Sequence, residues 1–541
     1  MNRTIALLGT ALGLVLSTPA LAHEAEVSRA TLERDVTILS HDNMEGREAG
    51  TRGHERAAGY VAGRMAAIGL EPAGDDGTYF QNVPMLRYQP TETGNTLTIT
   101  GPDGPMTLTA EVDYYAAGLG AQQSGTIEGE LVFIGYGLQI EGRDDFAGID
   151  LAGKIAVRVY GGPTGDETLD SEVLAHYNNS LRQRLSDRGA IATLTIRTPK
   201  LEESQSWEAT VASVSQDSSM TWLDAAGNPH TETPNLQAIT GLAPDAARAV
   251  MAGLDFDYDD VVAAEATPEA LMPSFAMGRT GRIEFSSTFD RVDTPNVVAM
   301  LPGSDPSMAD QYIVITGHLD HEGVQPTPEV GDDEIYNGAM DNAVGIAAML
   351  EVARLLADHP VRRPVLFVAL TAEEKGLVGS SYNAANPTVP ADQVVANLNV
   401  DMPIMTYAFS DIVPFGAARS NMYPYVAAAV AEAGLTLSGD PMPEQGVFTR
   451  SDQYSYVRNG IPVVYLEIGH GNGGQAPQED FLTNHYHESS DEVELVDFAA
   501  LTRFVAVDYA VVRNIANMAE RPAWNEGDFF GDLFARPPAG E

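Results

Sequence analysis

Between residues 311 and 401 the sequence alternates short apolar runs with stretches of helical periodicity. The apolar runs are 312–316, 364–370 and 394–400, and a helical pattern begins near residue 341. This alternation is typical of a sheet that is mostly parallel and covered by helices on both faces. We therefore predict an α/β fold with a mixed, mostly parallel central sheet. In such sheets, ligands bind beyond the carboxyl ends of the strands.

Residues that can bind a metal ion follow these apolar runs or begin the helical pattern. Taken singly, each has an ordinary structural explanation, such as an N-cap for Asp341. Together, carboxylates at one edge of a sheet would repel one another and resist desolvation, and one or two divalent cations would remove that cost. The sequence therefore predicts a metal site at this edge. Its candidate residues are His318, Asp320, Asp341, Glu373, Glu374 and Asp401.

The chain contains no cysteine, so a metal ion would have nitrogen and oxygen ligands only. Imidazole and carboxylate ligands suit zinc, with cobalt or manganese as possible substitutes. Two ions ~3.5–4 Å apart, bridged by one carboxylate and one water, form a hydrolytic site. That geometry needs a second histidine, and the segment NHYHESSDEVE offers His485 and His487.

The chain is strongly acidic, which limits the classes of partner. Its 541 residues include 76 acidic and 31 basic side chains, which gives a net charge of −45. A nucleic-acid-binding protein needs a basic surface, so we expect no nucleic-acid partner. The sequence gives no indication of the oligomeric state.

Residues 1–22 have the pattern of a secretory signal peptide. Arg3 supplies a positive charge, an apolar run covers residues 5–16, and residues 20–22 form an A-x-A cleavage site. The apolar run is shorter than the ~20 residues of a membrane-spanning helix, and no other stretch is long enough. We therefore expect cleavage after Ala22 and export to the periplasm or the extracellular space, without a membrane span.

Six short motifs in this order and spacing form a specific pattern. They are H-x-D at His318, G-x-x-D-N at Gly338, A-E-E-x-G-L-x-G-S at Ala372, the strand end at Asp401, S-D at Ser451 and Y-H-x-x-x-D at Tyr486. The pattern resembles the secreted di-zinc aminopeptidases of metallopeptidase family 28, which are relatives of glutamate carboxypeptidase and the transferrin receptor. The resemblance covers most of residues 30–110 and 290–515.

The resemblance implies a zinc-exopeptidase fold, of the phosphorylase/hydrolase-like kind, with two zinc ions. Asp341 would bridge the two ions, and Glu373 would be the general base. The remaining ligands would be His318 and Asp401 on one ion, and Glu374 and His487 on the other.

Supporting residues also follow from the resemblance. Asp320 would hold the His318 ring, and Asp491 would act similarly. His487 is preferred to His485 because only His487 fits the Y-H-x-x-x-D motif. We expect His321 and His470 to be supporting or loop residues.

The chain departs from several members of the family at Phe448, where those members have a tyrosine that stabilises the oxyanion. We expect Tyr454 or Tyr456 to replace it, or the metal ions to suffice.

The resemblance also divides the chain. Residues 23–111 and 279–520 would form a discontinuous zinc peptidase domain, in which helical patterns end at Gly69 and span about 497–518. Residues 112–278 are β-rich, lack clustered titratable pairs, and resemble an inserted protease-associated domain. Residues 521–541 are a Pro- and Gly-rich tail.

The activity implied is a metal-dependent exopeptidase that removes N-terminal residues from peptide substrates. A carboxypeptidase or dipeptidase, or a glutaminyl-cyclase-like enzyme, would use the same scaffold. A receptor-like binding protein with a dead site is the alternative from another class. The presence of all five presumed ligands and of the base argues against this last alternative.

Overall fold

A computed structural model of the chain describes residues 26–120, 122–140, 142–162, 170–216, 218–267, 270–325 and 333–534. The expected signal peptide, residues 1–22, lies outside the described residues, as does the end of the expected tail, residues 535–541. Within the described ranges, no helix combines the length and the hydrophobicity needed to cross a membrane.

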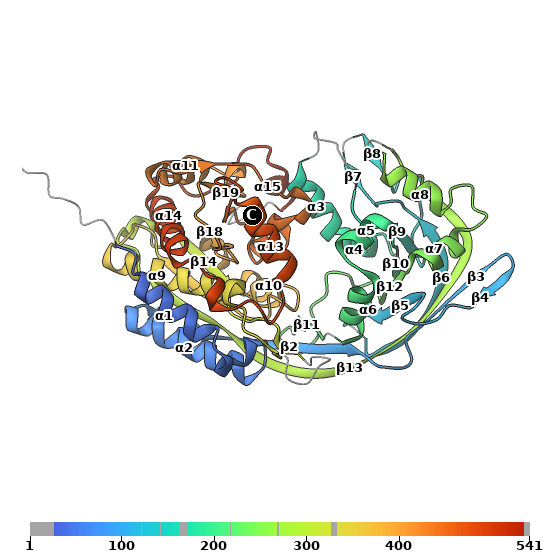
Figure 1. Cartoon of the computed structure of the whole chain (residues 1–541), viewed down its shortest axis with the longest axis horizontal. Coiled ribbons are helices and arrows are strands. Elements are labelled where there is room, and N and C mark those ends of the chain that lie inside the picture. The colour runs from blue at the N-terminus through green and yellow to red at the C-terminus, as the bar shows by residue number, and fades with distance from the viewer. Residues whose placement is uncertain are drawn as a thin grey trace, which may run out of the picture.

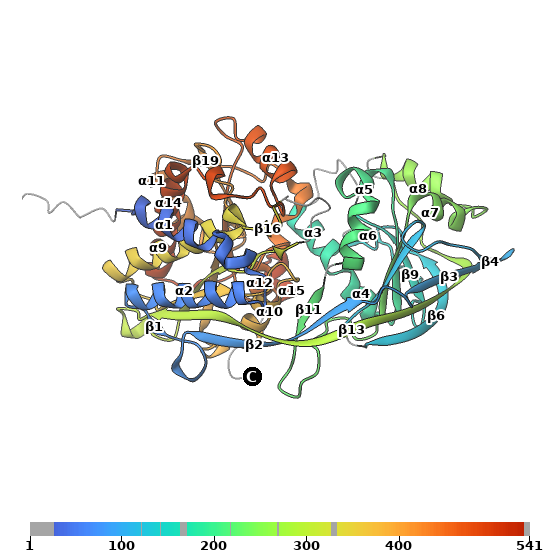
Figure 2. The ribbon, with the colours of Figure 1, turned by 60° about the horizontal axis from the view of Figure 1, so that its bottom comes forward.

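The structure has two lobes that are joined by one long strand, which contributes to the sheets of both. Figure 1 shows the first lobe on the left and the second on the right, with β2 (Phe80–Pro90) and β13 (Phe275–Leu301) running beneath both. The turned view of Figure 2 shows the same arrangement. The two strands are antiparallel, and residues 80–90 pair with residues 287–297.

The first lobe is built on a mixed sheet with the strand order β2–β13–β17–β14–β18–β21–β19–β20. Its central strands β17, β14, β18 and β21 are parallel. The prediction of a mixed, mostly parallel sheet is confirmed. The strands of this sheet not yet bounded are β14 (Tyr312–His318), β17 (Val365–Leu370), β18 (Val394–Asn399), β19 (Asp411–Phe415), β20 (Thr436–Leu437) and β21 (Val463–Ile468), with β1 (Glu71–Pro72) and β11 (Ser219–Trp222) added beside β13 and β2.

Helices cover both faces of this sheet because successive side chains of each strand point to opposite sides. In β17, Val365 and Phe367 face a core with α1, α2, α9, α11 and α14, whereas Leu366 and Val368 face a core with α10, α12 and α15. Full burial of one such side chain contributes about 1.5–3 kcal/mol. The helices are α1 (Arg29–Leu39), α2 (Arg52–Ile68), α9 (Val344–Asp358), α10 (Val378–Ala385), α11 (Tyr423–Glu432), α12 (Gln453–Arg458), α13 (Gln475–Asn484), α14 (Phe498–Asn517) and α15 (Phe529–Leu533).

The helix ends agree with the sequence patterns. Gly69, with φ of 94°, is the C-cap of α2, where a left-handed backbone favours glycine. Asp497 is the N-cap of α14 and accepts hydrogen bonds from the backbone N–H groups of Ala499 and Ala500. These caps satisfy N–H and carbonyl groups that have no partner within the helix.

The second lobe has its own sheet, with the order β4–β3–β13–β6–β9–β10–β12–β5. This sheet also contains β3 and residues 280–286 of β13, which lie outside the expected segment 112–278. The domain boundaries and the likeness to a protease-associated domain therefore stay predictions. The remaining elements are β3 (Thr96–Gly101), β4 (Gly104–Met106), β5 (Tyr114–Gly118), β6 (Ser124–Phe133), β9 (Ile155–Val159), β10 (Ala192–Ile196), β12 (Ala238–Leu242), α3 (Ser171–Asn179), α4 (Leu181–Asp187), α5 (Pro199–Ser204), α6 (Trp207–Gln216), α7 (Pro244–Met251) and α8 (Tyr258–Glu265), with the two-residue strands β7 (Gln139–Ile140), β8 (Arg143–Asp144), β15 (Gly323–Val324) and β16 (Ile335–Tyr336) in separate hairpins.

Helix α3 of the second lobe docks onto the first lobe. Asn179 donates hydrogen bonds to the carbonyl oxygen of Thr449 at 3.1 Å and to its hydroxyl at 2.7 Å. The buried His176 ring is hydrogen-bonded through Nδ1 to the hydroxyl of Tyr454. The second lobe therefore holds the segment that leads into α12.

Candidate metal centre

The ends of three parallel strands bring the predicted ligands together. His318 is the last residue of β14, Glu374 follows β17, and Asp401 follows β18. Asp341 lies in the turn Ala339–Ala343 before α9, and His487 lies in the turn after α13. The five side chains, which are far apart in the sequence, meet at one edge of the sheet, as the strand ends predict.

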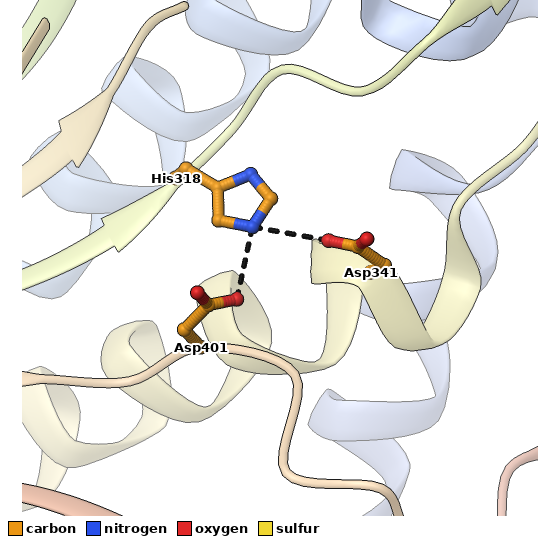
Figure 3. A group of neighbouring side chains, drawn as sticks. All are labelled: His318, Asp341 and Asp401. Atoms are coloured by element: carbon orange, nitrogen blue, oxygen red, sulfur yellow. Dashed lines mark hydrogen bonds and ion pairs between the residues drawn. The ribbon is translucent and has the colours of Figure 1, made fainter. Parts of the chain in front are cut away.

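One half of the cluster contains His318, Asp341 and Asp401, which Figure 3 shows pointing toward one another. The Nε2 atom of His318 lies 2.9 Å from Oδ1 of Asp401 and 3.1 Å from Oδ1 of Asp341. The other oxygen of Asp401, Oδ2, accepts a hydrogen bond of 2.5 Å from the hydroxyl of Ser451. All three members of this half are buried.

The other half contains Glu374 and His487. The Nε2 atom of His487 lies 3.1 Å from Oε2 of Glu374 and 3.3 Å from Oδ2 of Asp341. Asp341 thus directs Oδ1 toward His318 and Oδ2 toward His487, so one carboxylate faces both halves. This is the arrangement that a bridging ligand requires.

The donor set fits divalent metal ions of the zinc type. Ligand atoms of His318, Asp341 and Asp401 lie within 4.8 Å of one another, and so do those of His487, Glu374 and Glu322. The Nε2 atom of His487 is directed at carboxylate oxygens of both Glu374 and Asp341, at ion-pair distance. A metal ion would satisfy this nitrogen and would offset the charge of the surrounding carboxylates.

The pKa values of the two adjacent glutamates are shifted in opposite directions. Burial, reinforced by the Glu374 and Asp452 carboxylates, raises the pKa of Glu373 well above its usual range. The imidazoles of His487 and His321 outweigh burial and lower the pKa of Glu374. The surroundings of Glu373 and Glu374 therefore shift the two pKa values in opposite directions.

Electrostatics also couple the histidines to the bridging carboxylate. Burial opposes the charged form of His318, but Asp401 and Asp341 raise the pKa of its ring well above the usual value. The pKa of Asp341 is held well below its usual range, because His318 and His487 outweigh burial. The same attractions would favour binding of a cation between these groups.

Asp320 occupies a different place from the one expected. Its carboxylate does not hold the His318 ring but accepts the backbone N–H groups of Glu373 at 3.1 Å and Glu374 at 3.3 Å. The His318 ring is held instead through Nδ1, which lies 3.1 Å from the carbonyl oxygen of Asp320. The turn after β14 folds this carbonyl back onto the ring, which leaves the side chain free to cap the neighbouring loop.

Asp491 plays a similar part for Asp341. Its buried carboxylate accepts the backbone N–H of Met340 at 2.9 Å and that of Asp341 at 3.0 Å. His485, which does not fit the Y-H-x-x-x-D motif, bonds to Ser490 through Nδ1 at 2.8 Å. It belongs to none of the metal-binding groups among the described residues.

The two tyrosines expected to serve as oxyanion donors have other partners. The hydroxyl of Tyr454 bonds to His176 of the second lobe, and that of Tyr456 donates to Oδ1 of Asn383 at 2.6 Å. The expectation that either hydroxyl replaces the tyrosine missing at Phe448 is therefore wrong for this arrangement. The local sequence does not reveal these partners, because both are distant along the chain.

Arg47 is a buried residue beside the cluster that the sequence pattern did not indicate. Its guanidinium is fully buried and donates to the carbonyl oxygens of Leu319 at 2.8 Å, Asn337 at 2.6 Å and Gly338 at 2.9 Å. Burial lowers its pKa to about 10, while the nearby carboxylates, led by Asp341, favour its charged form. Arg47 thus ties together the loops that carry the ligands. It lies in a polar, Gly-rich segment whose pattern indicates only a loop.

Comparisons with known proteins relate this part of the chain to a family of peptidases. Residues 296–512 match the model described as Peptidase family M28. The chain is 26% identical over 295 residues to a "Probable zinc metalloprotease" of Pyricularia oryzae, covering 46% of this chain and 54% of that protein. It is 28% identical over 277 residues to "Probable leucine aminopeptidase 2" of Aspergillus fumigatus, covering 45% of this chain and 50% of that protein. The chain thus spans about half the length of these curated relatives.

A solved structure supports the fold. The "Aminopeptidase from Aneurinibacillus sp. strain AM-1" superimposes with a TM-score of 0.52 and 17% identity, covering 92% of this chain and 98% of that chain. At this identity the likeness shows the shared fold. The matched segment 296–512 contains the predicted ligands and Glu373. Residues 296–512, which lie in the first lobe, therefore match peptidase family M28.

Proposed function

We propose that the protein is an exported, zinc-dependent exopeptidase that hydrolyses N-terminal peptide bonds. The observation that carries the proposal is Asp341, whose two oxygens face His318 on one side and His487 on the other. The family match and the relative named as a probable leucine aminopeptidase support it. Aminopeptidase activity is favoured over the carboxypeptidase and cyclase alternatives by that name alone, so substrate tests must separate them.

Two zinc ions would be held by residues already close together. His318 and Asp401 would hold one ion, Glu374 and His487 would hold the other, and Asp341 would contact both. When bound, such ions lower the pKa of water and polarise the carbonyl of the scissile bond. The fold of the chain would hold these ligands in a buried cluster in which carboxylates and imidazoles alternate.

Glu373 would serve as the general base. One carboxylate oxygen of Glu373 lies within 4.8 Å of ligand atoms of both His318 and Glu374, so it is next to the cluster without being needed as a ligand. It would take a proton from the attacking water and pass it to the nitrogen of the leaving amine. Asp320 positions Glu373 by accepting its backbone N–H.

Removal of metal is expected to abolish hydrolysis of L-leucine p-nitroanilide, because the cluster would then lack its electrophile. Dialysis against a chelator, followed by addition of zinc or cobalt, should remove and restore the activity. Metal content is measured in parallel by mass spectrometry. Activity that persists in metal-free protein would contradict the proposal.

Glu373→Gln should keep both metal ions but lower kcat by about 10²–10⁴-fold or more, because the amide cannot accept the proton from water. Steady-state kinetics and metal analysis check the two parts of this expectation. Glu488→Gln, the same substitution at an exposed residue beside His487, is the matched control. Near-normal turnover of Glu373→Gln would exclude the assigned role.

Peptides with a free N-terminus are expected to be shortened from that end, whereas their N-acetylated forms should resist hydrolysis. Mass spectrometry of the products distinguishes the direction of cleavage. Loss of C-terminal residues from N-acetylated peptides would identify a carboxypeptidase instead. Release of ammonia from peptides that begin with glutamine would identify a cyclase.

Export is proposed from the pattern of residues 1–22. Expression of the full chain in a bacterium that exports proteins should yield a mature protein that begins at His23, which N-terminal sequencing checks. A protein recovered with its first 22 residues intact would contradict export by cleavage.

A further inference from the structure

A third imidazole, that of His321, lies against the metal-ligand cluster. Its side chain is completely buried, and its Nδ1 atom lies 2.8 Å from Oε1 of Glu374. The same atom is 3.8 Å from Oδ2 of Asp341. The other oxygen of Glu374, Oε2, faces Nε2 of His487 at 3.1 Å. Glu374 is therefore held between two imidazoles, with one carboxylate oxygen directed at each.

The partners of His321 define which of its nitrogens donates. A carboxylate oxygen only accepts hydrogen bonds, so the Nδ1 atom of His321 must carry the hydrogen in its contact with Glu374. The Nε2 atom of His321 is buried and has no hydrogen-bond partner among the described residues. The ring thus acts on the cluster through Nδ1 alone, as a donor to Glu374.

Close packing fixes the plane of the His321 ring. Gly338 has a φ of 55°, and a Cβ atom at this position would lie 2.5 Å from Cδ2 and 2.6 Å from Cγ of His321. On another side, the ring meets that of His487 edge-on, with centroids 5.7 Å apart. The glycine that begins the G-x-x-D-N motif therefore leaves the space that His321 occupies.

We propose that His321 is a positioning residue that holds Oε1 of Glu374 and thereby directs Oε2 toward the metal ion shared with His487. Without this hydrogen bond, the Glu374 side chain would be free to rotate, and its buried oxygen would lose its donor. Partners that orient a metal ligand in this way typically contribute 10–100-fold in metal affinity. The inference rests on the proposed two-zinc site. It adds a residue that affects the affinity for the zinc ion held by Glu374 and His487, and leaves the affinity for the other ion unchanged.

The experiment compares three variants of the full chain by titration with zinc in competition with a chromogenic chelator. His321→Leu removes the donor and keeps an apolar side chain of similar size. His321→Asn retains a donor near the position of Nδ1, and His321→Gln places its donor farther out, near the position of Nε2. His485→Leu is the matched control, because His485 bonds to Ser490 outside the cluster.

We expect wild type to bind two zinc ions. In His321→Leu, the affinity for one ion should fall by about 10–100-fold, and the affinity for the other should stay unchanged. His321→Asn should recover most of the loss and His321→Gln little of it. Thermal unfolding of the metal-free variants shows whether each is folded. If His321→Leu does not fold, the difference in zinc affinity between His321→Asn and His321→Gln still tests the inference.

Three results would overturn the inference. Two unchanged affinities in His321→Leu would show that the hydrogen bond to Glu374 does not matter, while the two-zinc site would still stand. Loss of one nitrogen ligand from the zinc sites of His321→Asn, measured by X-ray absorption, would make His321 a direct ligand. Binding of a single zinc ion by wild type would overturn both this inference and the proposed two-zinc function.

Discussion

The main physical constraint on this structure is a group of carboxylates that is buried at one edge of the sheet. At an effective dielectric constant of 20, two unit charges 4 Å apart interact by roughly 4 kcal/mol, so an uncompensated group of this kind would oppose folding. The chain supplies part of the compensation itself, through the His318 and His487 imidazoles and the buried guanidinium of Arg47. Divalent ions would complete it. The requirement for neutralisation therefore explains why acidic, imidazole and guanidinium groups meet at one sheet edge.

Main-chain groups do much of the positioning at this edge. Asp320 and Asp491 accept backbone N–H groups of the loops that carry Glu373, Glu374 and Asp341. Arg47 complements these carboxylates, because its guanidinium donates hydrogen bonds to carbonyl oxygens of the same region. Each loop is thus held by its backbone, which leaves the ligand side chains available for a metal ion. A loop fixed in this way keeps its geometry even though its own side chains repel one another.

The strands and the meeting of the candidate ligands at one sheet edge could be predicted from the sequence because both depend on local pattern. Apolar runs indicate strands, and polar residues at their ends indicate ligands, so His318, Glu374 and Asp401 were found together. The side-chain contact of Asp320, the partners of Tyr454 and Tyr456, and the role of Arg47 were not found. These depend on contacts between residues that are distant along the chain, such as Arg47 with Asn337. The extent of the second sheet was missed for the same reason, because β13 belongs to both sheets.

The continuity of β13 has a mechanical consequence. With 27 residues at about 3.3 Å each, the strand is roughly 90 Å long, and it passes beneath both lobes together with β2 (Figure 1). The lobes are therefore joined by a stiff two-stranded ribbon instead of a flexible tether, and their relative rotation requires the ribbon to flex. At the opposite side, Asn179 anchors Thr449, two residues before the Ser451 hydroxyl that contacts Asp401. Flexure of the ribbon would thus move the segment that leads to Ser451, whose hydroxyl contacts the candidate ligand Asp401.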